Sequence, residues 1–332
     1  MNEIVYSSGE ALPRHCRITL NFIIERNYMD EFKSGFLTIV GLPNVGKSTL
    51  LNNLIGSKVS IVTSKPQTTR DNIKAILTTE KMQIVFIDTP GLHRGKDLLG
   101  KRMSRHITEA IDGVDLVLLL VDATEETGPE DKFVLRWLSS NLKMPGKEEV
   151  KPVFLLLNKV DLLEDRSKVL TLIDYYKDKF SFKEIIPLSA LKGDNCDVLL
   201  NEIYKVLSPG PAYYPPEDIR DQEEDFIISE LIREKILLVT HQEVPYSVAV
   251  RVTEITEKKE GELLFISAII YVEKDSQKGI LIGKKGAMLK NIGSMARESI
   301  EETLKTKVYL ELTVKVKEKW RSSEKILKGW GY

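Results

Sequence analysis

FLTIVGLPNVGKST, residues 36–49, is the stretch that decides the fold. Its first part is an apolar run of strand length, its second part reads G-x-x-x-x-G-K-S, and leucine and isoleucine then recur at helical spacing from Leu50 to Ile55. Glycines allow backbone N–H groups to turn inward around a polyphosphate. The helix that follows adds its unpaired N–H groups and the positive end of its dipole. The stretch therefore predicts a strand, a phosphate-binding loop and a helix.

The same loop predicts how a nucleotide would be held. Lys47 would lie on the β- and γ-phosphates, and the Ser48 hydroxyl would bind Mg2+. The predicted phosphate site is a continuous run of residues: Gly41, Leu42, Pro43, Asn44, Val45, Gly46, Lys47, Ser48 and Thr49.

A second motif, Asp88-Thr89-Pro90-Gly91, follows the apolar run 82–87. A carboxylate at the end of a buried strand can reach Mg2+ through a water molecule, and the Gly91 N–H can sense the γ-phosphate. All four residues are therefore assigned to the phosphate site, and Asp88 also to the Mg2+ site.

The polar, threonine-rich loop 60–71 follows the first helix. Nucleotide switches place in such a loop a threonine that closes over Mg2+ in the triphosphate state. Thr68 and Thr69 are both candidates, and the loop alone does not choose between them. Leu92, after the second motif, cannot orient a water molecule as the glutamine of many GTPases does, so unassisted hydrolysis is expected to be slow. His93 is expected to be a mobile loop residue rather than a general base.

A third motif, N-K-x-D at residues 158–161, follows a core strand and is typical of a guanine reader. The Asp161 carboxylate would accept from the guanine N1–H and 2-amine, which adenine lacks, and two such charged bonds are worth about 1.5–3 kcal/mol each. The Ala190 N–H would donate to guanine O6. The predicted guanine site consists of Asn158, Lys159, Asp161, Ser189 and Ala190.

Near-continuous apolar runs indicate strands that are buried on both faces of a sheet. These runs are residues 36–40, 73–79, 82–87, 114–122, 153–157 and 185–188. Residues 129–142 have helical spacing. The sequence thus predicts an α/β nucleotide-binding domain with a mostly parallel sheet and its ligand loops at the carboxyl ends of the strands.

Length and composition indicate an ordinary globular protein of more than one domain. Of 332 residues, 42% are apolar and 29% are charged. The two cysteines, Cys16 and Cys196, are far apart, so they predict neither a disulfide framework nor a zinc site and fit a reducing cytoplasm. No apolar run approaches the roughly 20 residues that span a bilayer.

A composition break at residues 208–225, rich in proline and then in acidic residues, indicates a semi-rigid linker. Residues 1–28 carry no clear signal, and one explanation is that translation starts at Met29. The predicted organisation is an uncertain N-terminal extension (1–31), a nucleotide-binding domain (32–207), the linker (208–225) and a second domain (226–332).

The second domain has the pattern of an α+β KH domain of the second topological type. Its expected order is helix (226–239), two strands (247–256 and 262–272), helix, the loop G-K-K-G, helix (287–304) and strand (307–317). Residues 274–328 carry 14 Lys/Arg against 7 Asp/Glu, which is the footprint of a nucleic-acid surface. The predicted RNA site comprises Ile282, Gly283, Lys284, Lys285, Gly286 and Lys290, beside a groove for about four unpaired nucleotides. Trp320 and Trp330 are expected to be packing residues.

Together the motifs G-L-P-N-V-G-K-S-T, Q-T-T-R, D-T-P-G-L, N-K-V-D and S-A-L-K-G, joined to a KH domain, resemble the bacterial Era GTPases from about residue 32 to the end of the chain. The resemblance implies that Thr69, next to the arginine of Q-T-T-R, is the Mg2+ threonine. It also implies that Asn44 helps to hold a K+ ion that assists hydrolysis.

The resemblance further implies a monomer in the cytoplasm that can associate peripherally with the inner membrane. It implies binding to the 3′ end of 16S rRNA and a role in assembly of the small (30S) ribosomal subunit. Two rival hypotheses remain. A constitutive RNA-binding module with GTP as a structural ligand would bind RNA equally well with GTP and GDP. A GTPase that assists RNA modification would need a third, substrate-handling site, for which the sequence offers no candidate cluster.

Overall fold

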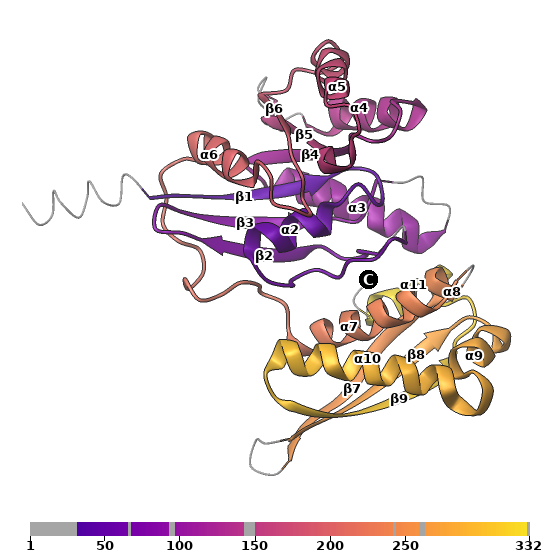
Figure 1. The fold of residues 1–332 in the computed structure, drawn as a ribbon. Coiled ribbons are helices and arrows are strands. Elements are labelled where there is room, and N and C mark those ends of the chain that lie inside the picture. The colour runs from indigo at the N-terminus through magenta and orange to yellow at the C-terminus, as the bar shows by residue number, and fades with distance from the viewer. Residues whose placement is uncertain are drawn as a thin grey trace, which may run out of the picture.

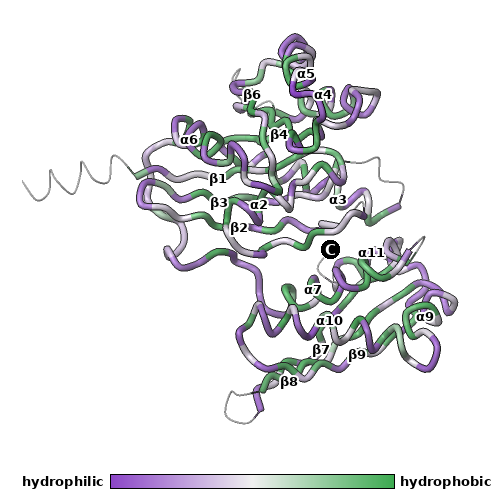
Figure 2. Tube along the Cα trace, viewed as in Figure 1, coloured by the Kyte–Doolittle hydropathy of each residue, from purple (hydrophilic) through white to green (hydrophobic). Residues whose placement is uncertain are grey.

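The computed structural model describes residues 32–65, 68–92, 97–142, 150–241, 244–258 and 263–330. They form two units, each built on its own sheet (Figure 1). The first sheet has six strands and the second has three. Apolar residues concentrate on the strands and on the inner sides of the helices (Figure 2). The N-terminal extension and His93 lie outside the described residues.

The first sheet has the order β2-β3-β1-β4-β5-β6, with all neighbours parallel except β2 and β3. Its strands are β1 (Lys33–Val40), β2 (Ile73–Thr78), β3 (Met82–Asp88), β4 (Leu116–Asp122), β5 (Val153–Asn158) and β6 (Glu184–Pro187). This confirms the mostly parallel sheet. Because parallel strands share a direction, the loops after β1, β3 and β5 meet at one edge of the sheet.

Both faces of this sheet are covered by helices. On one face, α2 (Lys47–Ile55) and α6 (Cys196–Val206) pack against the strands. On the other face lie α3 (Leu98–Asp112), α4 (Pro129–Asn141) and α5 (Ser167–Lys177). Double coverage explains why the strands are continuous apolar runs rather than alternating ones. The spacing of apolar residues predicted α2 and α4 but not α3, α5 and α6.

The proline-rich segment after α6 lies along the edge of the first sheet. Backbone bridges join Lys33 to Pro209 and Ala75 to Arg220. The buried Gln83 side chain accepts from the N–H groups of Tyr213 and Tyr214 at 2.6 and 3.0 Å. The segment expected to be a spacer is therefore attached to the strands of the first sheet over most of its length.

The second sheet has the order β7-β8-β9, with β7 and β8 antiparallel and β8 and β9 parallel. Its strands are β7 (Ala249–Lys258), β8 (Leu263–Val272) and β9 (Lys307–Val316). Its helices are α7 (Glu224–Val239), α8 (Val244–Ser247), α9 (Asp275–Ile282), α10 (Ala287–Leu304) and α11 (Glu324–Trp330). In β8, alternate residues are buried against α7 and α10, which is the pattern of a sheet with helices on one face.

The start of β7 differs from the sequence-based expectation, whereas the two tryptophans lie as expected. The expectation that a strand starts at Ser247 is wrong, because Val244–Ser247 forms the short helix α8 and β7 begins at Ala249. Trp320 is fully buried and Trp330 stacks on Tyr271 at 4.5 Å, which confirms that both tryptophans are packing residues. None of the described helices combines the length and apolar character that crossing a bilayer requires.

Candidate functional sites

The phosphate-binding loop joins β1 to α2 in a conformation that only certain residues can adopt. Gly46 has φ +104°, and a Cβ there would lie 2.3 Å from the Asn158 Nδ2 atom. Asn44 also has a positive φ, 65°. Asn158 Nδ2 donates to the Val45 carbonyl at 2.7 Å, so the loop is fixed to the end of β5. In front of the loop lies a cavity of about 370 Å³ that Lys47, Ser48, Thr69 and Gly91 also line.

Lys47 is buried at the floor of this cavity. Its Nζ donates to the carbonyls of Gly41 and Leu42 at 3.2 and 2.9 Å. Burial lowers the pKa of Lys47 to about 8, although the nearby Asp88 carboxylate opposes this shift. A phosphate anion at this position would offer the Lys47 ammonium a full negative charge in place of the partial charges of the two carbonyl oxygens.

Hydroxyl groups and one carboxylate converge beside Lys47. Asp88 Oδ2 accepts from Ser48 Oγ at 3.0 Å, from Ser60 Oγ at 2.9 Å and from Thr69 Oγ1 at 3.4 Å. Ser48 Oγ and Thr69 Oγ1 are 3.1 Å apart. Asp88 Oδ1 is buried with no hydrogen-bond partner among the described residues, and burial raises the Asp88 pKa. An all-oxygen set of this kind fits Mg2+.

The two switch threonines point in different directions. Thr68 Oγ1 donates to the Lys65 carbonyl and contacts Thr63 Oγ1, both at 2.7 Å. Thr69 is buried and faces the oxygen cluster. The structure therefore brings Thr69, and not Thr68, to the candidate metal site. Ser60, which completes the cluster, was missed because a lone serine gives no signal in sequence.

The segment after β3 is tied to the phosphate loop. Thr89 Oγ1 donates to the Ile39 carbonyl at 2.8 Å, and the Leu92 N–H donates to the Gly41 carbonyl at 2.9 Å. The Leu92 side chain is 3% exposed and packs in the core. Pro90 is buried, and a Cβ on Gly91 would lie 2.9 Å from Pro43. The backbone of Gly91 thus lies directly against the phosphate loop.

Asn158 connects the guanine motifs. Besides its bond to Val45, its Oδ1 accepts from the Ala190 N–H at 2.8 Å, so this N–H is directed to Asn158 in the structure. Lys159 has φ 66°, and its Nζ forms an ion pair with Asp122. Ser189 is buried, and its Oγ accepts from the Lys192 N–H at 3.1 Å. Asp161 is half-buried in the single 3-10 turn Val160–Leu162, which follows β5.

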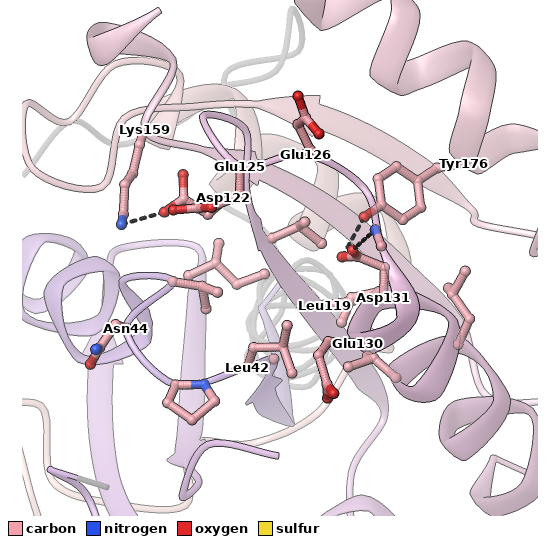
Figure 3. Close-up of a pocket in the computed structure, with 18 of the residues that line it drawn as sticks. Leu42, Asn44, Leu119, Asp122, Glu125, Glu126, Glu130, Asp131, Lys159 and Tyr176 are labelled. Atoms are coloured by element: carbon pink, nitrogen blue, oxygen red, sulfur yellow. Dashed lines mark hydrogen bonds and ion pairs between the residues drawn. The ribbon is translucent and has the colours of Figure 1, made fainter. Parts of the chain in front are cut away.

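A larger cavity, about 510 Å³, lies on the other side of the phosphate loop (Figure 3). Its charged lining is mostly acidic, with Asp122, Glu125, Glu126, Glu130 and Asp131, and Lys159, which also lines it, is ion-paired with Asp122. The Tyr176 hydroxyl donates to Asp131 at 2.9 Å across its wall. Five carboxylates would repel a polyphosphate, so the smaller cavity is the better nucleotide site despite its size.

The G-K-K-G loop separates α9 from α10. Gly283 and Gly286 have φ 70° and 78°, and a Cβ on Gly283 would lie 2.7 Å from that of Met288. Lys284 and Lys285 are exposed, whereas Ile282 packs partly buried against the core. Lys285 itself has φ 52°. The loop therefore presents two lysines to solvent on a backbone whose two glycines have positive φ.

Beside this loop, α10 and β9 enclose a groove of about 530 Å³. Its lining comprises Gly286, Leu289, Lys290, Gly293, Ser294, Arg297, Val308, Tyr309, Leu310 and Leu312. The sequence analysis found only Gly286 and Lys290 of this set. Arg297 could have been found, because it lies seven residues after Lys290 and so on the same helix face. Tyr309 could not, since its place in the groove depends on the pairing of β9 with β8.

Comparisons with known proteins agree with this geometry. The 50S ribosome-binding GTPase family matches residues 36–159, and the KH domain family matches residues 243–321. GTPase Era of Clostridioides difficile is 46% identical over 302 residues, covering 91% of this chain and 99% of its own. GTPase Era of Geobacter metallireducens is 48% identical over 303 residues, with the same coverage.

Two solved structures are also similar. One is a crystal structure of Era in complex with MgGDPNP and nucleotides 1506-1542 of 16S ribosomal RNA. The other is a variant of Aquifex aeolicus Era bound to GDP.AlF4-. Each is 39% identical, has a TM-score of 0.85, and covers 91% of this chain and 99% of its own. A phosphate loop, a guanine motif and a KH groove in one chain, matched over nine-tenths of its length, show that this GTPase belongs to the Era family.

Proposed function

We propose that the protein is a GTP-controlled assembly factor of the small ribosomal subunit that binds the 3′ end of 16S rRNA in its KH groove. The observation that carries the proposal is the groove of α10 and β9, with an apolar floor, Lys290 and Arg297 on its wall and the G-K-K-G loop at its end. Such a groove fits unpaired nucleotides. The solved Era complex with a 16S rRNA fragment supports the identity of the RNA.

In the GTP site, Lys47 would bind the β- and γ-phosphates and the Gly91 N–H the γ-phosphate. Ser48 and Thr69 would ligate Mg2+, with Asp88 reaching it through water. Mg2+ would neutralise charge that develops on the phosphates, while the buried hydroxyls of this chain hold it in place. The oxygen cluster around Asp88 supports these roles.

Asp161 would read guanine, and Asn158 would hold the base site and the phosphate loop together. The two hydrogen bonds of Asn158, to the Val45 carbonyl and from the Ala190 N–H, support this role. The Ala190 N–H would turn to guanine O6 only when Asn158 shares or releases it.

The K+ ion assigned to Asn44 is part of the same proposal. Asn44 is exposed at the mouth of the cavity, and its Nδ2 donates to the Ser64 carbonyl of the switch loop at 2.9 Å. Because Leu92 is buried and cannot hydrogen-bond water, hydrolysis would depend on added positive charge. GTP turnover should fall when K+ is replaced by Na+. Equal turnover in the two salts would remove K+ from the mechanism.

On the basis of the family resemblance, the protein is further proposed to be a cytoplasmic monomer that associates peripherally with the inner membrane. Sedimentation of the purified chain tests the monomer. Flotation with vesicles of bacterial lipids tests the association.

The main test is the affinity for a short RNA from the 3′ end of 16S rRNA, measured at one stated salt concentration with GDP and with a non-hydrolysable GTP analogue. We expect tighter binding with the analogue, and no such difference for an RNA of scrambled sequence. Equal, sequence-specific binding in both states would support a constitutive RNA-binding module instead. Absence of binding in both states would reject the RNA assignment.

A further inference from the structure

The switch loop, which the structure describes over residues 58–65 and 68–72, lies between the nucleotide cavity and the second unit. Its two ends are held from the KH side by α7. The Glu234 carboxylate accepts from Lys58 Nζ at 2.7 Å and from the Val62 N–H at 3.3 Å. The Arg233 guanidinium donates to the Thr68 carbonyl, and Lys65 donates to the last carbonyls of α7. The loop that carries the metal-site threonine is thus also fixed by residues that are far from it in sequence.

Arg70 also connects the switch loop to the second unit. It follows Thr69 directly, is 3% exposed and extends away from the nucleotide cavity into the second unit. Its Nη1 donates to the Val248 carbonyl at 2.6 Å, and its Nη2 to the carbonyls of Pro245 and Tyr246 at 3.3 Å. These carbonyls belong to α8 and the residue after it, so the guanidinium caps the carboxyl end of a short helix.

The three carbonyl groups form a socket for the Arg70 guanidinium, and Trp320 completes this socket. The guanidinium carbon of Arg70 lies 5.8 Å from the centre of its ring, which is cation–π distance. The indole N–H donates to the Ser247 carbonyl at 2.9 Å and fixes the ring beside α8. A planar guanidinium suits this site because it can hydrogen-bond in its plane and stack through its face.

The side chains of Thr69 and Arg70 therefore point in opposite directions from adjacent Cα atoms, which are about 3.8 Å apart. The Thr69 hydroxyl faces Ser48 and Asp88, while the Arg70 side chain is anchored in the KH unit. If the KH unit moves away and takes these carbonyl groups and the Trp320 ring with it, either the Arg70 contacts break or the Thr69 backbone moves.

We propose that Arg70 is a positioning residue through which the docked KH unit holds Thr69 at the Mg2+ site, so that docking and triphosphate binding strengthen each other. The inference rests on the role proposed above for Thr69. Thermodynamic linkage makes the effect reciprocal: if docking raises GTP affinity, GTP strengthens docking by the same factor. GDP lacks the γ-phosphate against which the threonine closes, so it gains less from a fixed Thr69.

The test measures dissociation constants of the full chain for GDP and for a non-hydrolysable GTP analogue, with Mg2+ and without RNA. For Arg70→Ala we expect about a tenfold loss of analogue affinity, within the range of ordinary coupling, and less than about a twofold change for GDP. Arg102→Ala is the matched control. It removes another arginine that pairs across the interface, with Glu324 of α11. Because Glu324 is mostly exposed, this pair adds little to docking, and the ratio of the two affinities should change by less than about twofold.

An equal loss for both nucleotides, or no loss for either, would overturn the proposal. Arg70→Met keeps the length of the side chain and gives the same two readings if Arg70→Ala does not fold. Since the assay contains no RNA, a failure of the rRNA assignment would leave its result untouched. Conversely, an unchanged affinity ratio in the Arg70 variants would leave the rRNA assignment standing.

Discussion

The proposed nucleotide site and the proposed RNA groove would bind phosphate in opposite ways. In the first, Lys47, Thr69 and Asp88 are each less than a tenth exposed and are hydrogen-bonded to other parts of the protein. In the second, Lys284, Lys285 and their neighbours stand in solvent around an apolar floor.

The difference follows from what each site must do. A metal-bound triphosphate has to be held in one geometry, and buried dipoles around it act in a medium of low dielectric constant. A flexible RNA strand needs charge along its path and apolar contact with its bases, and its exposed charges are screened by salt. Changes in the first site should therefore be large and insensitive to salt, and changes in the second moderate and dependent on salt.

The largest effect is expected for Gly46→Ala. A methyl group at φ +104° and 2.3 Å from Asn158 Nδ2 would force the phosphate loop away from the guanine motif. We expect more than a hundredfold loss of GDP affinity by calorimetry, since several charge-assisted hydrogen bonds of about 1.5–3 kcal/mol are lost together. RNA affinity without nucleotide should stay within about twofold, by the ordinary independence of distant sites.

Gly113→Ala is the matched control for this substitution, because a Cβ there would meet nothing within 4 Å. Normal nucleotide binding by Gly46→Ala would mean that the phosphate loop adapts to the added methyl group. The nucleotide site would then not depend on one fixed geometry.

A smaller effect is expected when Lys284 and Lys285 are both changed to alanine. RNA affinity should fall roughly tenfold at physiological salt, and the slope of log affinity against log salt should flatten by about 1.4, which is about 0.7 for each phosphate group that the variant no longer neutralises. Nucleotide affinity should not change. Lys315→Ala, which removes an exposed lysine of β9 that does not line the groove, should leave both quantities unchanged. An unchanged salt slope in the double variant would show that the two lysines do not bind phosphates.

The smallest effect concerns Glu234, which joins the switch loop to α7. Burial works to raise its pKa, but the hydrogen bonds from Lys235 and Lys58 outweigh burial and leave the pKa below its ordinary value. A depressed carboxyl pKa stabilises the folded state above the unfolded pKa of about 4.3, and this contribution is lost as pH falls. Glu234→Gln should lower Tm by roughly 2–4 °C at pH 7 and by less at pH 4.

Asp174→Asn breaks an exposed ion pair with Lys177 and should change Tm little at either pH. A Tm difference between wild type and Glu234→Gln that is as large at pH 4 as at pH 7 would show that the carboxylate charge is not what stabilises this interface.

Sequence was sufficient to locate candidate site loops that are made of contiguous residues. The phosphate loop, the motif at 88–91 and the guanine motif each combine a strand end with a short run whose backbone geometry requires particular residues. Their meeting at one edge of the sheet followed from parallel strand order alone. The KH unit was predictable in the same way, from the order of its elements and the two glycines of its loop.

Sequence was insufficient where two distant segments complete one another. Arg70 and its acceptor on Val248 are 178 residues apart, and neither segment carries a pattern that names the other. The choice of Thr69 over Thr68 on structural grounds needed the positions of Ser48 and Asp88. The groove wall formed by Tyr309 and Leu310 needed the register of an edge strand.

The attachment of the proline-rich segment to the first sheet limits how far the two units can separate. Asp221 is held by Lys74 at 2.8 Å, and α7 begins at Glu224, so residues 222 and 223 alone connect this anchor to the helix. The three Cα–Cα steps from Asp221 to Glu224 span at most about 11 Å. An undocked KH unit therefore remains at an effective concentration of about millimolar or more around its docking surface. Docking at such a concentration needs little intrinsic affinity, and a modest bias from the bound nucleotide suffices to change which arrangement is populated.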